Sequence, residues 1–309
     1  MTAAPRPRLV PWAIFAALIA AAGLPIYIHA PKFYVDEYGV SLASLGLVLF
    51  GLRLVDVLQD PALGWLAERT KTRRRPMVAA AAALMTLSML GLFAITPPTA
   101  PLIWFALTLA GVFSAFSFLT ICFYAQGVEK AAGLEVARLG MGNPGAGSPG
   151  GSGHLRLAGW REAGALIGIS LAAVAPSVLA AVTLRPFAAF ALGFAALALL
   201  ATLAMRMEWT ARGHVLAAAP FSAIGDPMAR RLLLLAMVNA APVAVTSSLF
   251  LFFVESRLQA PGLEGPLLLL FFATAAVAAP IWSRLAARFG AKRVLMAGMG
   301  LAVLAFGFA

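Results

Sequence analysis

A charged face lies within the otherwise apolar stretch RLVDVLQDPALG, which begins at Arg53. Arg53, Asp56 and Asp60 are spaced i, i+3 and i+7, so they would share one face of a helix. Arg53 would balance one carboxylate, which leaves the face with a net negative charge when both aspartates are ionised. Carboxylate oxygens bind hard cations and also accept protons. The face therefore predicts a coupling site in which Asp56 and Asp60 bind Na⁺ or H⁺ and Arg53 balances their charge.

A purely structural interpretation of the same residues stays open. In it, a buried ion-pair cluster pins this helix to its neighbours. Charged side chains within a membrane span cost roughly 2.5–3.5 kcal/mol each and usually face the bundle interior or a water-filled cavity. A single ion pair would be enough for pinning, so the second carboxylate favours the coupling site. Pro61 is expected to kink the helix and to free a carbonyl oxygen that a cation could use.

The composition of the whole chain is that of an all-α integral membrane protein. The 309 residues are 62% hydrophobic and 11% charged, with a mean hydropathy of +0.92. Soluble domains are about half apolar and about a quarter charged, and long apolar runs cross a bilayer as helices. We expect spans at 10–30, 42–66, 77–96, 102–124, 159–182, 186–205, 232–254 and 265–283, and a short ninth from about 294. Either the native chain continues past Ala309 or the last helix is unusual.

The basic residues predict the orientation of these spans. Nineteen of the 23 Lys and Arg residues fall in connections on one side, and only Lys32, Arg185 and Arg257 fall on the other. By the positive-inside rule the N-terminus is cytoplasmic, in a bacterial-type inner membrane. The net charge of +11 therefore reflects topology rather than nucleic-acid binding. The single cysteine and the scattered histidines offer no metal site, and no nucleophile–base set indicates an enzyme.

The chain is expected to contain two related halves. DPALGWLAERTKTRRR, from Asp60, matches APIWSRLAARFGAKR, from Ala279, at a constant offset of 219 residues. This spacing predicts a six-helix unit used twice in parallel. We expect a six-helix bundle over 1–206, a central cytoplasmic loop over 207–230, and the start of an incomplete second bundle over 231–309. Glycine-rich residues 139–153 are expected to be a flexible cytoplasmic insertion. The second copy is uncharged where the first carries its charged face.

Several motifs resemble the glycoside-pentoside-hexuronide:cation symporters, the melibiose-permease-like branch of the major facilitator superfamily. The motif R-x-x-D-x-x-x-D-P-x-x-G, followed by WLAERTKTRRRP, is similar to that family's second helix and following loop. FYVDEYGVSLASLG, WREAG and FLFFVE are further similarities, and only 139–153 falls outside the resemblance. The resemblance implies the major facilitator fold. It also implies that Asp56 and Asp60 bind the coupling cation, assisted by the hydroxyl of Ser117.

The family's sugar site is matched less well. Its acidic residues fall at Ala20 and Thr120, and its stacking tryptophan falls at Tyr124. Losing both acids argues against a melibiose-type galactoside carrier. Asn239, on the seventh expected span, either lines the substrate cavity with Thr120 and Tyr124 or forms hydrogen bonds between helices, worth roughly 0.6 kcal/mol each.

The stretch GWLAERTKTRRR also fits the cytoplasmic gate motif of major facilitator proteins, G-x-L-A-[DE]-R. Gly64 would permit close helix approach, and Glu68 with Arg69 could form ion pairs that hold the cytoplasmic side shut. Arg73 and Arg161 would join this gate. For Arg73 the alternative is an arginine that only signals topology.

These features together predict a secondary transporter rather than an enzyme. We expect cation-coupled symport of a small solute, such as a sugar or glycoside, by alternating access. Beyond the coupling ion no cofactor is expected, and no metal beyond a Na⁺ at Asp56 and Asp60. Membrane lipids and the solute are the expected partners, with the chain either a monomer or part of a larger membrane complex. The alternative is a non-transporting subunit or assembly factor derived from the same fold.

Overall fold

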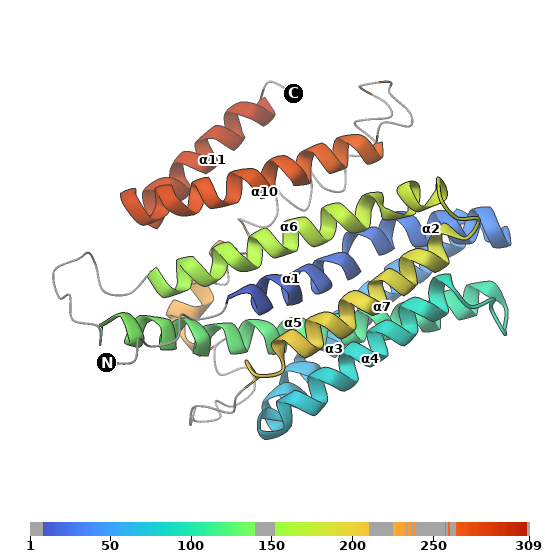
Figure 1. The fold of residues 1–309 in the computed structure, drawn as a ribbon, viewed down its shortest axis with the longest axis horizontal. Coiled ribbons are helices and arrows are strands. Elements are labelled where there is room, and N and C mark those ends of the chain that lie inside the picture. Colours follow the sequence, from blue (N-terminus) through green and yellow to red (C-terminus); the bar gives the residue numbers. More distant parts are fainter. Residues whose placement is uncertain are drawn as a thin grey trace. The chain divides into compact units, whose positions relative to one another are not determined.

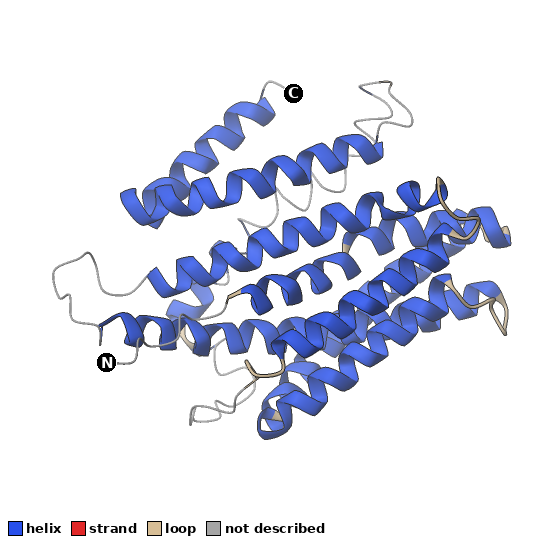
Figure 2. Ribbon diagram, viewed as in Figure 1, coloured by secondary structure: helices blue, strands red, loops and turns tan. Residues whose placement is uncertain are grey.

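Every element of the described chain is a helix, which confirms the expected all-α class. The computed structural model describes residues 9–139, 152–209 and 264–307, with scattered positions between 225 and 259. No strand occurs in these parts of the chain (Figures 1 and 2). The helices are α1 (Val10–Ala22), α2 (Leu24–Tyr38), α3 (Leu42–Arg69), α4 (Arg74–Phe93), α5 (Pro101–Leu139), α6 (Ser152–Ala180), α7 (Pro186–Met205), α10 (Glu264–Phe289) and α11 (Ala291–Gly307), with a short 3₁₀ turn at Lys71–Arg73.

Five helices in the described residues are long and apolar enough to cross a membrane. They comprise residues 71–93, 101–134, 153–180, 186–205 and 269–289, and a bent α3 makes a sixth when its two parts count as one span. The expected span at 232–254 and Asn239 lie largely or wholly outside the described residues, as does most of the expected insertion at 139–153. The division into two six-helix halves stays a prediction.

The first expected span, over residues 10–30, is broken near its middle. Helix α1 ends at Ala22, and α2 begins directly after Gly23. Pro25 lies in the first turn of α2, where its missing N–H group costs no hydrogen bond. A glycine followed so closely by a proline therefore separates two helices where hydropathy alone predicts one.

Helix α1 is at the centre of the N-terminal bundle. It packs against α6 and α7 and also contacts α5 (Figure 1). Trp12, Phe15 and Leu18 of α1 are fully buried, whereas large aliphatic residues such as Leu58 on α3 and Leu171 on α6 are exposed. Exposed leucines are expected on a bundle whose outer surface is covered by lipid.

Glycines on α6 allow it to approach α1 at backbone distance. A Cβ atom placed on Gly164 would collide with the main chain of Ala13, and one placed on Gly168 would collide with the main chain of Ala17. The two glycines are four residues apart, and so are the two alanines that they face. This is the spacing of the small-residue motifs that bring membrane helices together. A larger residue therefore cannot replace either glycine while α1 and α6 keep this contact.

Polar contacts tie the chain just beyond α7 to the N-terminal bundle. Glu208 accepts hydrogen bonds from Lys130 Nζ at 2.6 Å and from Trp12 Nε1 at 3.2 Å. The main-chain oxygen of Trp209 accepts one from Arg75 Nε at 3.2 Å. The Trp209 side chain is only 4% exposed. This segment is therefore packed against α1, α4 and α5.

Candidate functional site

The charged face lies on α3 beside a bend in that helix. Ser41 caps the helix by accepting a hydrogen bond from the N–H of Ser44. The axis bends by 46° between its parts Leu42–Asp56 and Leu58–Arg69. Pro61 explains the position of the bend, because its ring has no N–H group and clashes with the carbonyl four residues earlier, that of Val57. The expected kink is therefore present, one residue after Asp56.

Arg53 is paired with one of the two aspartates. Its Nη1 atom donates to Asp56 Oδ2 at 3.4 Å, and the side chains are 59% and 16% exposed, respectively. The guanidinium also lies over the ring of Phe113 on α5, 5.6 Å from its centroid. Asp60 is exposed, and no ion pair links it to another residue of the described chain. One carboxylate is thus balanced and the other is available.

Two polar residues that the sequence did not single out join this face to α5. The hydroxyl of Ser114 donates to Gln59 Oε1 at 3.1 Å. The amide nitrogen of Gln59 is buried and has no hydrogen-bond partner in the described chain. The signal for Gln59 was its position three residues after Asp56, beside the charged face. Ser117, the hydroxyl expected near the aspartates, makes no hydrogen bond with any described residue.

The expected substrate residues on α5 are partly accessible. Tyr124 is 50% exposed, and the Arg161 guanidinium of α6 lies over its ring, 4.3 Å from the centroid. Arg161 also lies 5.7 Å from the centroid of the neighbouring Phe123. The hydroxyl oxygen of Thr120, one turn earlier, is buried without a partner in the described chain. Arg161, expected at the cytoplasmic gate, is therefore positioned against a residue of the expected substrate cavity.

Two of the expected gate residues, Glu68 and Arg69, contact side chains that are three or four residues away in the sequence. Glu68 pairs with Lys71 at 3.5 Å, and the Arg69 guanidinium lies over the ring of Trp65, 4.0 Å from its centroid. Arg73 is exposed. A Cβ atom placed on Gly64 would meet nothing within 4 Å in the described structure. Among the residues that the structure describes, Glu68 and Arg69 make local contacts and form no ion pair with another α-helix.

Comparison with known proteins places the chain in a transporter family. The family model described as MFS/sugar transport protein matches residues 12–138 and 145–309, which is nearly the whole chain. No curated protein and no solved structure matches the sequence. The unmatched residues 139–144 fall within the expected glycine-rich insertion. The match agrees with the resemblance to glycoside-pentoside-hexuronide symporters and favours a transporter over an enzyme. The apolar helices agree with a multi-pass membrane protein, and the chain belongs to the MFS/sugar transport family.

Proposed function

We propose that the protein is a secondary transporter that couples movement of a small solute to Na⁺ or H⁺. The observation that carries this proposal is the charged face of α3, where Arg53 balances Asp56 and leaves Asp60 without an ion pair in the described chain. Such a face costs insertion energy, and a lone structural ion pair would not need the second carboxylate. Location in a bacterial-type inner membrane with a cytoplasmic N-terminus belongs to the same proposal.

The coupling ion would bind beside the bend in α3. Both carboxylates could supply oxygens, and the bend frees the main-chain oxygen of Val57 from its usual helical hydrogen bond. The side-chain carbonyl of Gln59, which accepts a hydrogen bond from Ser114, offers a further oxygen ligand to the cation. A bound cation would neutralise the net negative charge of the face and favour one arrangement of the helices. Because coupling is reciprocal, solute would then tighten cation binding by the same factor.

The solute would bind at Tyr124 and Arg161. The exposed ring of Tyr124 offers a stacking surface for a sugar ring, and Arg161 offers donors to hydroxyl or carboxylate oxygens. Thr120 adds a hydroxyl that has no partner in the described chain. Hydrogen-bond donors therefore predominate at this site, whereas the sugar site of the resembling family is formed by carboxylates, which accept hydrogen bonds. This favours a sugar or glycoside rich in acceptor oxygens, including acidic ones.

Replacing Tyr124 by alanine is expected to raise the KM for the solute roughly threefold to tenfold, because the stacking surface is lost. Tyr124→Phe keeps the ring and should change KM little. The measurement is exchange of labelled solute across proteoliposomes at equal cation concentrations on both sides. An unchanged KM in Tyr124→Ala would remove Tyr124 from the substrate cavity.

The proposed function is tested by solute accumulation in proteoliposomes under an inward Na⁺ or H⁺ gradient. The panel comprises sugars, glycosides and organic acids. At least one should accumulate above its external concentration, and an ionophore that collapses the gradient should abolish this accumulation. If no solute accumulates and the chain co-purifies stably with a membrane complex, the transport proposal fails in favour of the non-transporting alternative.

A further inference from the structure

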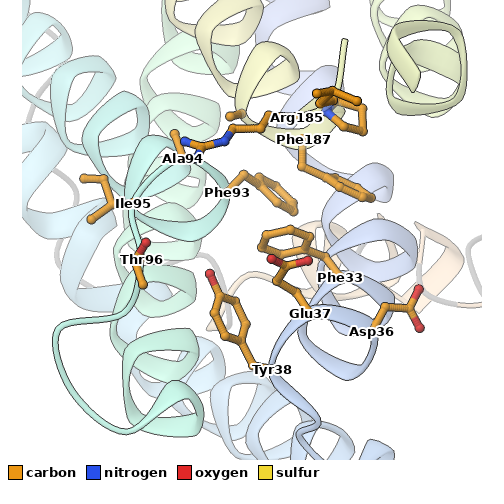
Figure 3. Close-up of a pocket in the computed structure, with 13 residues that line it drawn as sticks. Phe33, Asp36, Glu37, Tyr38, Phe93, Ala94, Ile95, Thr96, Arg185 and Phe187 are labelled. Carbon is orange, nitrogen blue, oxygen red and sulfur yellow. The ribbon is translucent and has the colours of Figure 1, made fainter. Parts of the chain in front are cut away.

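A pocket of about 340 Å³ lies where the ends of α2 and α4 meet the start of α7. Helix α4 begins at Arg74, directly after the 3₁₀ turn at Lys71–Arg73, and ends at Phe93 in the pocket. The pocket and this turn therefore lie at opposite ends of α4. The rings of Phe33, Phe93 and Phe187 form the apolar part of the pocket, with centroids 4.8–5.5 Å apart (Figure 3). This site is separate from the charged face of α3.

Two opposite charges line the pocket without being paired to each other. Glu37 and Arg185 form no ion pair within 4.0 Å in the described chain. Asp36, the third charged lining residue, is bound to Lys32 at 2.9 Å. Figure 3 shows Arg185 and Glu37 on different sides of the phenylalanine cluster, with Asp36 directed away from it. A ligand that carries a positive and a negative group could therefore satisfy both charges.

The surroundings of the pocket indicate an amphipathic ligand. Leu184 and Ile95 line the pocket and are 102% and 51% exposed, and such residues on a membrane bundle contact lipid. Arg185 directly precedes α7. The first residue of α7, Pro186, has no N–H group, but the N–H groups that follow it in the first turn favour an anion such as phosphate. Tyr38, beyond the first expected span, also lines the pocket. Burial raises the pKa of its phenol and the charge of Glu37 raises it further, so its hydroxyl remains a donor.

We propose that this pocket binds the phosphoethanolamine headgroup of a membrane phospholipid. The phosphate binds at Arg185 and the start of α7. The primary ammonium binds at Glu37, whose carboxylate accepts its N–H groups, and lies near the phenylalanine rings. The acyl chains follow the exposed aliphatic surface at Leu184 and Ile95. This arrangement requires both charges of the headgroup, and so distinguishes phosphatidylethanolamine from phosphatidylglycerol, which has no ammonium.

Native mass spectrometry of the full chain in mild detergent tests the proposal. The protein is titrated with phosphatidylethanolamine and phosphatidylglycerol of identical acyl chains. Wild type should bind the ethanolamine lipid about tenfold more tightly, since charge-assisted hydrogen bonds to the ammonium are lost with glycerol. Glu37→Gln should remove this preference and leave phosphatidylglycerol binding unchanged, whereas Arg185→Gln should weaken binding of both lipids. Arg156→Gln, a change of the same charge as Arg185→Gln at an exposed position near the start of α6 and outside the pocket lining, should alter neither.

Two results would overturn the proposal. The first is equal affinity of wild type for the two lipids, which requires no variant and so does not depend on variant folding. The second comes from free phosphoethanolamine, the soluble form of the same headgroup. If it raises the Tm of the delipidated protein as much as the lipid does, the pocket binds a soluble zwitterion and not a membrane lipid.

Discussion

Asp56→Asn is expected to abolish cation-driven uptake while the protein still inserts and folds. The substitution preserves the shape of the side chain but removes the charge that Arg53 balances at 3.4 Å. Arg53 would then offset Asp60, so the face would carry no net charge. One charge pair at about 4 Å is worth roughly 4 kcal/mol at an effective dielectric constant of about 20, which corresponds to roughly a thousandfold weaker cation binding.

Two measurements separate loss of coupling from loss of folding. Gradient-driven uptake should fall to the level of empty liposomes, and addition of Na⁺ should no longer raise the Tm of the purified variant. Asp226→Asn is the matched control: Asp226 accepts a hydrogen bond from the N–H of Met228 and lies outside the charged face, and asparagine can keep this bond. Normal accumulation by Asp56→Asn would mean that the carboxylate is structural and that the coupling assignment is wrong.

Gly168→Leu is expected to prevent formation of the N-terminal bundle. The new side chain would enter the space that the main chain of Ala17 occupies, so α1 and α6 would have to separate. Inserting extra methylenes into a well-packed core typically costs 1–3 kcal/mol, and a collision with main-chain atoms has no flexible side chain to relieve it. We expect a cost at or above about 3 kcal/mol. The measurement is the amount of monodisperse protein after detergent extraction, together with its Tm.

Gly193→Leu on α7 is the control for this substitution. Gly193 is exposed, and a Cβ atom there would meet nothing within 4 Å in the described structure. The two variants add the same apolar side chain to a membrane helix, so hydropathy and insertion are matched. If Gly168→Leu yields as much monodisperse protein as Gly193→Leu, at the same Tm, the close approach of α1 and α6 is not required for the fold.

The sequence predicted the parts of the site that depend on spacing along one helix. Arg53 and Asp56 pair because residues three apart are neighbours on a helix, and the bend follows from the chemistry of proline. Residues on α5 were harder to place, because α5 is apolar around most of its circumference and its sequence does not indicate which side faces α3. Packing decides that rotation, and it brings Ser114 to Gln59.

Contacts made by long side chains were also beyond prediction from the sequence. Arg161 was expected at the cytoplasmic gate, which stays a prediction, but the contact of its guanidinium with the ring of Tyr124 was not expected. An arginine carries its charge several bonds from the backbone, so the neighbouring helix determines where that charge lies. The break at Gly23 was missed for a different reason, because hydropathy does not record the loss of a helical hydrogen bond.

The contacts of Glu208 and Trp209 have a consequence for the tether between the two expected halves. The expected central loop begins at residue 207, but the bundle holds the chain through Trp209, with Lys130 and Arg75 contributing the bonds. In the expected two-half organisation, the connection to the second half would therefore start after Trp209 rather than at residue 207, and a shorter connection would raise the effective concentration of the second half at the first. The Lys130–Glu208 contact is an ion pair, so loss of either charge would break it. The connection between the expected halves would then become longer without any change in the sequence.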